Sequence, residues 1–539
     1  MRKKLLAGIL ALALCSTNMP LQTIFAEEFT SGNPDVVSEE ETPEIFTNEE
    51  QETAGETDEE LSVFSSEEVP EFNDAPDEAM AAAENEQAGE IDLADNDKVI
   101  NGVYTIRSAG DHKFTCSRET GNRIVVDGGN TSEQDNINIY LNKVNINTST
   151  GPALRINVNV KATVTIYLTG TNNLIAKNTW HAGLQKANTA SLIITTKVLD
   201  PTAGILNAHG SSDGDGAGIG GSNITINSCS VIASSKYGAG IGGNKQGAGS
   251  NITINSASVT ASSTDGAGIG GGLYGDGSDI IINSSSVTAS STNGAGIGGG
   301  KGGAGSNNIT INGGSVKASS VSGSPTNGGK EVYCCTIENP ENANVTIKTG
   351  TGSSVNWKPV NHSSLDPDDT NLYVWLPKLE SNSTNSYLII LDPENSSESR
   401  TRNYSFDTVT NTFKAAQVVN DFIFKSPVNL IYDGQPKEAS LEFKFKPTHE
   451  NNRKISLVYY KGNYNDINEN TQPLQGVPVN AGTYTVKAEI EASKSYFAHK
   501  GLVSPKWTFT IEKAPVAPGA DPNETTISVP WSCKKISDI

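Results

Sequence analysis

The chain has 539 residues, of which 61 are acidic and 39 basic, and its formal net charge at pH 7 is −22. Residues 27–97 hold 26 acidic residues and no basic one, and three basic residues precede them, so the chain from residue 98 onward is nearly neutral, with 36 basic and 35 acidic residues. A neutral body excludes a typical nucleic-acid-binding protein, which needs a basic surface to replace phosphate counterions.

The first 26 residues have the features of a secretory signal. A basic start, Arg2–Lys4, precedes the apolar run Leu5–Leu14, and Ala26 is a small residue suited to cleavage. The run is too short to cross a bilayer, and no later apolar stretch reaches the roughly 18 residues that a span needs. We therefore predict a signal peptide over 1–26 and a secreted, extracellular protein without a membrane span, either released or associated with the cell surface.

Residues 27–97 form a low-complexity segment rich in Glu, Ala, Ser and Thr, without a sustained apolar period. Such a segment buries too little surface to offset the entropy of its chain. We predict a disordered acidic leader over 27–97. Its charge suits a solubilising spacer or a calcium-attracting brush.

The centre of the chain repeats almost literally. Each unit contains the sequence Gly-Ala-Gly-Ile-Gly-Gly, then a strand similar to Asn-Ile-Thr-Ile-Asn, then a strand of the form Ser-Val-x-Ala-Ser. The later units are 28 or 29 residues apart, a period typical of solenoids, in which each unit buries its apolar face against the next. The glycine-rich sequence begins at Gly216, Gly238, Gly266 and Gly294.

Alternation within the strands gives each unit an interior. Ile224 and Ile226 of one strand point to the same side, because side chains in a strand alternate between two faces. Ile219 supplies another wall, and the third strand alternates in the same way. Three short strands per unit, with no helical segment between them, predict an all-β chain built on a right-handed parallel β-helix. Weaker units upstream extend the predicted β-helix to residues 98–350.

Two stretches and the repeat resemble a known family. The run Gly151–Leu154, the strand Ala162–Asn172 and the later glycine-rich units are similar to the carbohydrate-binding parallel β-helix family of secreted clostridial proteins. The likeness covers residues 98–350. It implies binding of a polysaccharide or surface glycan, in some members an acidic plant polysaccharide with calcium. It carries over no individual binding residue.

The remaining segments predict further β modules. Residues 351–420 carry apolar strands between polar turns, which indicates a small β segment. Alternating strands over 421–514 predict a β-sandwich. Residues 515–539 begin what we interpret as a further, truncated module. Within 421–514, three runs resemble the MBG-type, Ig-like repeats of bacterial surface proteins, which implies a spacer or adhesion role: Pro427–Gly434, Val479–Val486 and Trp507–Ala514.

Candidate sugar-binding residues lie where the first weak repeat is interrupted. Trp180 and His181 stand before the Ala-Gly-Leu sequence that corresponds to the glycine-rich unit. An aromatic ring suits the apolar face of a sugar, so both residues are candidates for carbohydrate binding. Packing within the core or a loop is the alternative role for both.

Calcium is the candidate ion. Asp213, Asp215, Asp276 and Asp279 offer carboxylate oxygens in the repeat region, the ligands that calcium prefers. They also suit turns without any ion, and the spacing of calcium-binding β-rolls is absent. The sequence therefore leaves calcium open and requires no cofactor.

Polysaccharide-cleaving enzymes also use parallel β-helices, so catalysis is a further alternative. Such an enzyme would need clustered carboxylates beside an arginine or lysine base. The acidic residues of 210–320 do not recur at one position of the repeat. We predict no catalytic residue and no enzymatic activity, although three carboxylates beside Arg123 or Arg155 would revive the lyase or hydrolase hypothesis.

The first functional hypothesis is therefore a carbohydrate-binding, adhesin-like surface protein of Gram-positive type. The second is a structural or adhesive stalk whose partner is a host or bacterial surface protein. A line of outward aromatic and acidic side chains along one face of the solenoid would favour the first. A face of Asn, Ser and Thr alone would favour the second.

Overall fold

A computed structural model describes residues 89–515, except 129–130, 179, 198–203, 306–307, 341–342, 350–353, 358–368, 380–385, 394–398, 446 and 448–450. The predicted signal peptide, residues 27–88 of the acidic leader and residues 516–539 of the predicted last module lie outside the described residues. Within the described ranges the chain is all-β, with short 3-10 turns at η2 (Val419–Asp421) and η4 (Tyr464–Asp466). No helix in these ranges is both long and apolar enough to cross a membrane.

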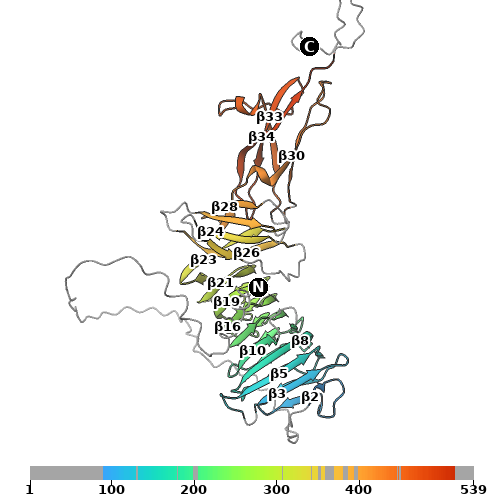
Figure 1. Ribbon diagram of the computed structural model, residues 1–539. Coiled ribbons are helices and arrows are strands. Elements are labelled where there is room, and N and C mark those ends of the chain that lie inside the picture. The colour runs from blue at the N-terminus through green and yellow to red at the C-terminus, as the bar shows by residue number, and fades with distance from the viewer. Residues whose placement is uncertain are drawn as a thin grey trace, which may run out of the picture. The chain divides into compact units, whose positions relative to one another are not determined.

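The first part of the chain coils into a stack of parallel strands with three walls (Figure 1). The first wall is an eight-stranded sheet in chain order. Its strands are β2 (Val103–Ile106), β4 (Arg123–Val126), β7 (Leu154–Ile156), β9 (Leu184–Lys186), β12 (Ile219–Gly220), β15 (Ile241–Gly242), β18 (Ile269–Gly270) and β20 (Ile297–Gly298).

The second and third walls belong to one larger sheet, because three long strands run through both of them. The second wall contains β1 (Ile91–Asp92), β3 (Gly110–Thr115), β5 (Asn136–Asn142), β10 (Ser191–Thr196), β13 (Ile224–Asn227), β16 (Gly249–Asn255) and the first halves of β8 (Thr163–Ala176), β19 (Gly277–Ser291) and β21 (Ile309–Ala318). The third wall contains β6 (Asn145–Thr148), β11 (Gly204–His209), β14 (Ser230–Ser234), β17 (Ser258–Ser263) and the second halves of β8, β19 and β21.

The predicted inward positions are buried. Ile224 pairs with Ile252, which pairs with Ile280 on the next coil, and all three are fully buried. Burying one such side chain contributes about 1.5–3 kcal/mol. On the outside, the Nδ2 of each asparagine donates to Oδ1 of its equivalent on the preceding coil at 2.8–2.9 Å, through Asn227, Asn255, Asn283 and Asn312. The repeat therefore stacks identical residues, as the sequence predicts.

One residue per coil turns the chain from the second wall to the third. Ser228, Ser256 and Ser284 adopt left-handed conformations with φ of 46–48°, and Gly313 takes the same place with φ 85°. A single left-handed residue bends the chain without a loop, which explains why β19 continues through this corner as one strand.

The glycine-rich sequence allows backbone to pack directly on backbone at the first wall. A Cβ added to Gly242 would lie 2.0 Å from the carbonyl oxygen of Gly270 on the next coil. Gly270 has φ +131°, and its Cβ would lie 2.0 Å from the carbonyl oxygen of Gly298. Only glycine fits such positions without displacing the neighbouring coil.

The ordered stack begins earlier than the sequence predicts. Ile91–Asp92 pairs in parallel with Phe114–Thr115, and Leu93 is fully buried in the core of the solenoid. The boundary predicted at residue 97 is therefore displaced, because a short apolar strand at the end of the acidic leader covers the first coil.

The stack also ends before the predicted residue 350. Its last parallel contacts join Ile297 to Val321 and Thr310 to Thr326, the latter in β22 (Thr326–Asn327). Trp375 then donates from Nε1 to the carbonyl oxygen of Val316 at 2.9 Å and packs against the core of the solenoid. The strand that carries Trp375 thus covers the last coil.

That strand belongs to the small β segment, which is antiparallel apart from one parallel contact between β23 and β29. The segment starts at residue 330, whereas the sequence predicts residue 351. It has its own apolar core. Its strands are β23 (Lys330–Glu338), β24 (Asn344–Lys348), β25 (Ser354–Trp357), β26 (Asn371–Pro377), β27 (Ser386–Asp392), β28 (Arg400–Asp407) and β29 (Thr412–Ala415).

The C-terminal described segment has two small antiparallel sheets that share one core. The rings of Phe422, from the first sheet, and Trp507, from the second, meet edge to face with centroids 6.5 Å apart. The first sheet contains β30 (Phe422–Lys425) and β31 (Ser440–Phe443), and the second contains β32 (Ile455–Lys461), β33 (Gly482–Ile490) and β34 (His499–Ile511).

Candidate functional site

One position of the coil carries a line of large and charged side chains. This position lies four residues before the first residue of each of the last five strands of the first wall, β9, β12, β15, β18 and β20. Because Leu184, Ile219, Ile241, Ile269 and Ile297 pair in register, the residues at this position also fall on successive coils. We call them the corner column: Trp180, Asp215, Tyr237, Asp265 and Asn293.

Hydrogen bonds confirm this register. The backbone N–H of Tyr237 donates to Gly214 at 3.3 Å, and that of Asp265 donates to Lys236 at 2.8 Å, the contacts of neighbouring parallel strands. Asn293 also donates from its side chain to Oδ1 of Asp265 at 2.9 Å. The corner column is therefore held by the same ladder as the walls.

A second line runs beside the corner column, in the loops that follow the wall strands. The backbone N–H groups of Lys245, Leu273 and Lys301 donate at 2.7–2.8 Å to the carbonyl groups of Asp215, Tyr237 and Asp265. We call the two lines, together with Tyr274, the corner surface.

Aromatic rings are exposed on the corner surface. The side chain of Trp180 is 55% exposed and that of Tyr274 is 59% exposed. Tyr274 packs over Gly302, where an added Cβ would lie 2.7 Å from the tyrosine ring. The half-buried Tyr237 precedes Gly238, and its carbonyl group binds the loop that carries Tyr274.

Each acidic side chain of the corner column pairs with a lysine from the neighbouring line. Lys245 lies 3.3 Å from Asp215, and Lys301 lies 3.7 Å from Asp265. The ammonium group of Lys245 also lies 5.5 Å from the centre of the Tyr237 ring. The surface thus combines aromatic rings with carboxylates whose charge is largely compensated.

The sequence prediction finds part of this surface. Trp180 lies on it, and His181 is the next residue, whose carbonyl carbon would be 2.1 Å from a Cβ on Gly216 of the following coil. Tyr237 and Tyr274 were missed. Their signal in the sequence is positional, because Tyr237 precedes a glycine-rich unit and Tyr274 lies just beyond the next one.

The four aspartates considered for calcium do not come together. Asp213 pairs with Lys236 at 3.2 Å, and this hydrogen bond raises the pKa of Lys236. Asp276 accepts from the backbone of Ala304 at 2.5 Å, and Asp279 accepts from Asn308 and Ser278 at 3.0 Å. Among the described residues, no group of three or more His, Cys, Asp or Glu side chains is arranged to hold a metal ion.

A second outward aromatic pair lies on the second wall. Tyr140 and Tyr167 pair in register, and their rings stack with centroids 4.8 Å apart at 12°. The ammonium group of Lys197 lies 4.2 Å from the centre of the Tyr140 ring. Burial and the nearby Asp111 raise the pKa of Tyr140. One ring therefore covers the other, and a lysine covers the pair.

Arg123, considered as a catalytic base, is buried against the backbone. A Cβ on Gly151 would lie 1.9 Å from its Nη1, so the guanidinium packs over that glycine. Arg155 lies beside Val125 and Gln185 in the same wall.

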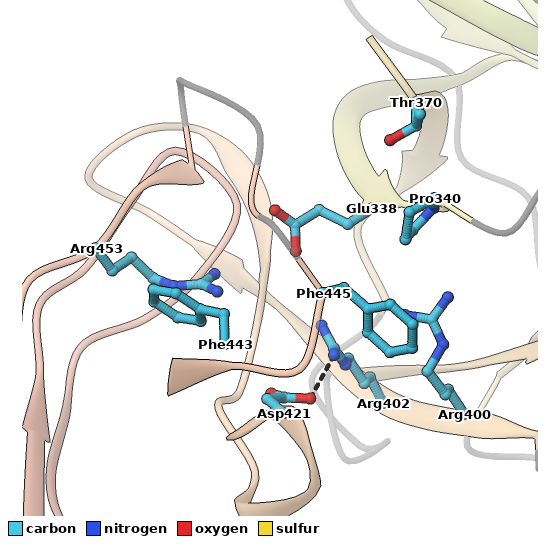
Figure 2. Close-up of a pocket in the computed structure, with 9 residues that line it drawn as sticks. All are labelled: Glu338, Pro340, Thr370, Arg400, Arg402, Asp421, Phe443, Phe445 and Arg453. Atoms are coloured by element: carbon cyan, nitrogen blue, oxygen red, sulfur yellow. Dashed lines mark hydrogen bonds and ion pairs between the residues drawn. The ribbon is translucent and has the colours of Figure 1, made fainter. Parts of the chain in front are cut away.

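Figure 2 shows a pocket outside the solenoid, where arginines meet rings and carboxylates. Arg402 forms a buried ion pair with Asp421, and Tyr496 donates its hydroxyl to Glu338 at 2.7 Å. The guanidinium of Arg400 lies 4.4 Å from the centre of the Phe445 ring. These contacts are those of a packed polar network. The lining residues are Glu338, Pro340, Thr370, Arg400, Arg402, Asp421, Phe443, Phe445 and Arg453.

Comparison with known proteins identifies the repeat. A family model described as the beta helix repeat matches residues 224–245, 252–273, 280–301 and 309–328. Each match starts at an inward isoleucine of the second wall, and these isoleucines pair in register from coil to coil. No curated protein and no solved structure matches the chain. Together with the stacked walls, the match identifies the chain as a parallel β-helix protein.

Proposed function

We propose that the chain is a secreted carbohydrate-binding protein of the cell surface, and that the corner surface is its glycan-binding site. The observation that carries the proposal is the corner surface, on which Trp180, Tyr237 and Tyr274 lie on three coils of one stack, with aspartates and lysines between the rings.

The chemistry of these side chains suits sugars. An aromatic ring packs against the apolar face of a sugar ring, while carboxylate, ammonium and amide groups hydrogen-bond its hydroxyls. Because the ladder already fixes the backbone that carries these side chains, binding has to order only the side chains themselves, which limits its cost in entropy. The pairing of Asp215 and Asp265 with lysines supports a binding role for these carboxylates and not one in proton transfer.

In this proposal, the segments before and after the solenoid present the glycan-binding site outside the cell. In the proposal the signal peptide directs export, the acidic leader keeps the protein hydrated, and the segment 421–514 is an MBG-type, Ig-like spacer. The likeness of residues 98–350 to secreted clostridial carbohydrate-binding proteins supports a polysaccharide as the ligand. The proposal needs no calcium and no catalytic step.

A protein-binding stalk is the second candidate. The outward side of the second wall carries Thr225, Thr253 and Thr310 beside the asparagine ladder, a mostly polar face that the exposed Ile281 interrupts. Such a face supports a structural role for the central coils.

Glycan-array binding and polysaccharide pull-down test the proposal, with the full chain, its variants Trp180→Ala and Tyr274→Ala, and a control. We expect each variant to lose about tenfold or more in affinity, because aromatic anchors dominate such contacts. Tyr464→Ala removes a partly exposed tyrosine of the C-terminal segment and should leave binding unchanged.

The same experiment separates the alternatives. Binding without shortening of the polysaccharide, with and without chelator, supports a lectin-like protein that needs no calcium. Shortening indicates an enzyme. If no glycan binds, the carbohydrate proposal is wrong and the stalk becomes the better account.

A further inference from the structure

The corner column alternates along the stack. Trp180 and Tyr237 are separated by Asp215, and Tyr237 is followed by Asp265 on the next coil. The two aromatic residues of the corner column thus lie two coils apart. Since neighbouring strands lie about 4.8 Å apart, the aromatic positions repeat at about 10 Å along the axis of the coils.

On the corner surface, no comparable line of aromatic side chains runs across the axis of the coils. Between the two lines of the corner surface, within one coil, the chain from Gly238 to Gly243 is buried and consists of small residues and Ile241. A ligand that crossed the coils would meet a single aromatic position of the column. A ligand parallel to the axis meets one position of the column on each coil.

We propose that the glycan lies along the axis of the coils, with one sugar ring per coil. This inference rests on the proposed function and names its ligand class. The alternation fits an unbranched, extended polysaccharide in which neighbouring rings are turned over, so that the same face recurs at every second ring. Rings of such chains repeat at nearly the spacing of the coils.

The intervening positions have a defined role in this arrangement. A ring between Trp180 and Tyr237 lies over Asp215, whose carboxylate keeps acceptor capacity beside Lys245 and is 19% exposed. Asp265 lies one coil beyond Tyr237. Its side chain is 14% exposed and pairs with Lys301 in the same way. Each carboxylate–lysine pair offers both an acceptor and a donor to sugar hydroxyls.

The aromatic series ends at Asn293, the corner residue of the last strand in the first wall. This residue occupies the coil on which the next aromatic ring would fall. The series therefore offers two aromatic positions, which a ligand of three rings spans.

A length series tests the inference. Oligosaccharides of β-1,4-linked glucose, from one to six rings, are titrated into the full chain by calorimetry, with α-1,4-linked oligomers of equal length as the coiled comparison. We expect affinity to rise about tenfold between two and three rings for the β-linked series only, because the third ring reaches the second aromatic anchor.

Variants assign the rise to the column. Trp180→Ala and Tyr237→Ala should each abolish the step, whereas Tyr464→Ala should retain it. Asn293→Tyr places a third ring on the next alternate coil and should add a second step at five rings. Because Asn293 donates to Asp265, circular dichroism of this variant must match that of the wild type.

The outcomes separate the two proposals. If two rings bind as tightly as six, if the step survives both Ala variants, or if only the α-linked series shows it, the axial inference is wrong while carbohydrate binding stands. If neither series binds, the ligand class is wrong. Absence of binding across the glycan array overturns the proposed function itself.

Discussion

Lys186 is a charged residue inside the solenoid. It ends β9, pairs in register with Ile156 and is 5% exposed. Its ammonium group donates to the carbonyl oxygens of Ala187, at 2.9 Å, and Ser222. Burial lowers the pKa of Lys186 from 10.5 to about 8, because no carboxylate compensates the cost of removing the ammonium group from water.

This lowered pKa makes stability depend on pH. Between about pH 8 and 10.5 the unfolded chain binds a proton at Lys186 that the folded chain has released, so the contribution of Lys186 to folded stability rises with pH in that window and is flat below it. The rise is at most about 3 kcal/mol. Lys186→Met should remove it, as judged by urea unfolding at pH 7, 8, 9 and 10. The surface variant Lys161→Met should keep the wild-type slope, and a slope in Lys186→Met equal to that of the wild type would contradict the assignment.

At the residue scale, the sequence predicts Trp180 as a candidate for sugar binding but not its companions on the corner surface. The side chain before each glycine-rich unit differs from copy to copy, as Asp215, Tyr237, Asp265 and Asn293, so repetition does not mark the position. Only the strand register shows that these residues share one line. The lysine partners of Asp213 and Asp215 are also hidden from sequence reasoning, since they lie 23 and 30 residues away.

At the element scale, the strands of the repeat are predictable and the boundaries are not. The inward isoleucines recur at each coil, and the register confirms them. By contrast, β24 alternates like a strand of the coil yet pairs in antiparallel fashion with β27. Alternation shows which side chains of a strand share a face, but it does not show whether the neighbouring strand is parallel or antiparallel. For this reason the sequence extends the predicted β-helix too far, to residue 350.

The glycine-rich turns give an element-scale prediction. Gly270→Ala combines a left-handed backbone with a Cβ 2.0 Å from a carbonyl oxygen on the next coil. We expect a loss of at least about 2 kcal/mol in the free energy of unfolding, measured in urea.

Gly121→Ala is the matched control for this change. Its Cβ would meet its nearest neighbour, the carbonyl oxygen of Asn147, at 3.9 Å. Its effect should stay within about 0.5 kcal/mol. Equal effects of the two substitutions would show that backbone packing at Gly270 does not stabilise the stack.

At the scale of the whole molecule, the stack should tolerate loss of a complete coil. Deleting residues 252–279 joins Asn251 to Ile280, and Ile280 occupies the place of Ile252 in the register. Because each coil contacts only its neighbours, the shortened solenoid should fold with a modestly lower melting temperature.

Deletion of half a coil, by contrast, should prevent the solenoid from folding. Removing 252–265 places Gly266, the start of a glycine-rich unit, where a second-wall strand belongs. The shifted chain should lose its β-sheet circular dichroism and become sensitive to protease. If both deletions behave alike, the coil is not the independent unit that the register indicates.

The covered last coil affects whether copies of the protein can associate end to end. A stack of parallel strands ends in unpaired N–H and C=O groups, which act as a template for added strands. At the C-terminal end of this stack, the backbone carbonyl of Val316 accepts from the indole of Trp375, and the hydroxyl Oγ of Ser315 accepts from the backbone N–H of Tyr373. With that template occupied by its own chain, one molecule cannot continue the stack of another from this end, so crowded copies remain separate particles and do not grow into fibres.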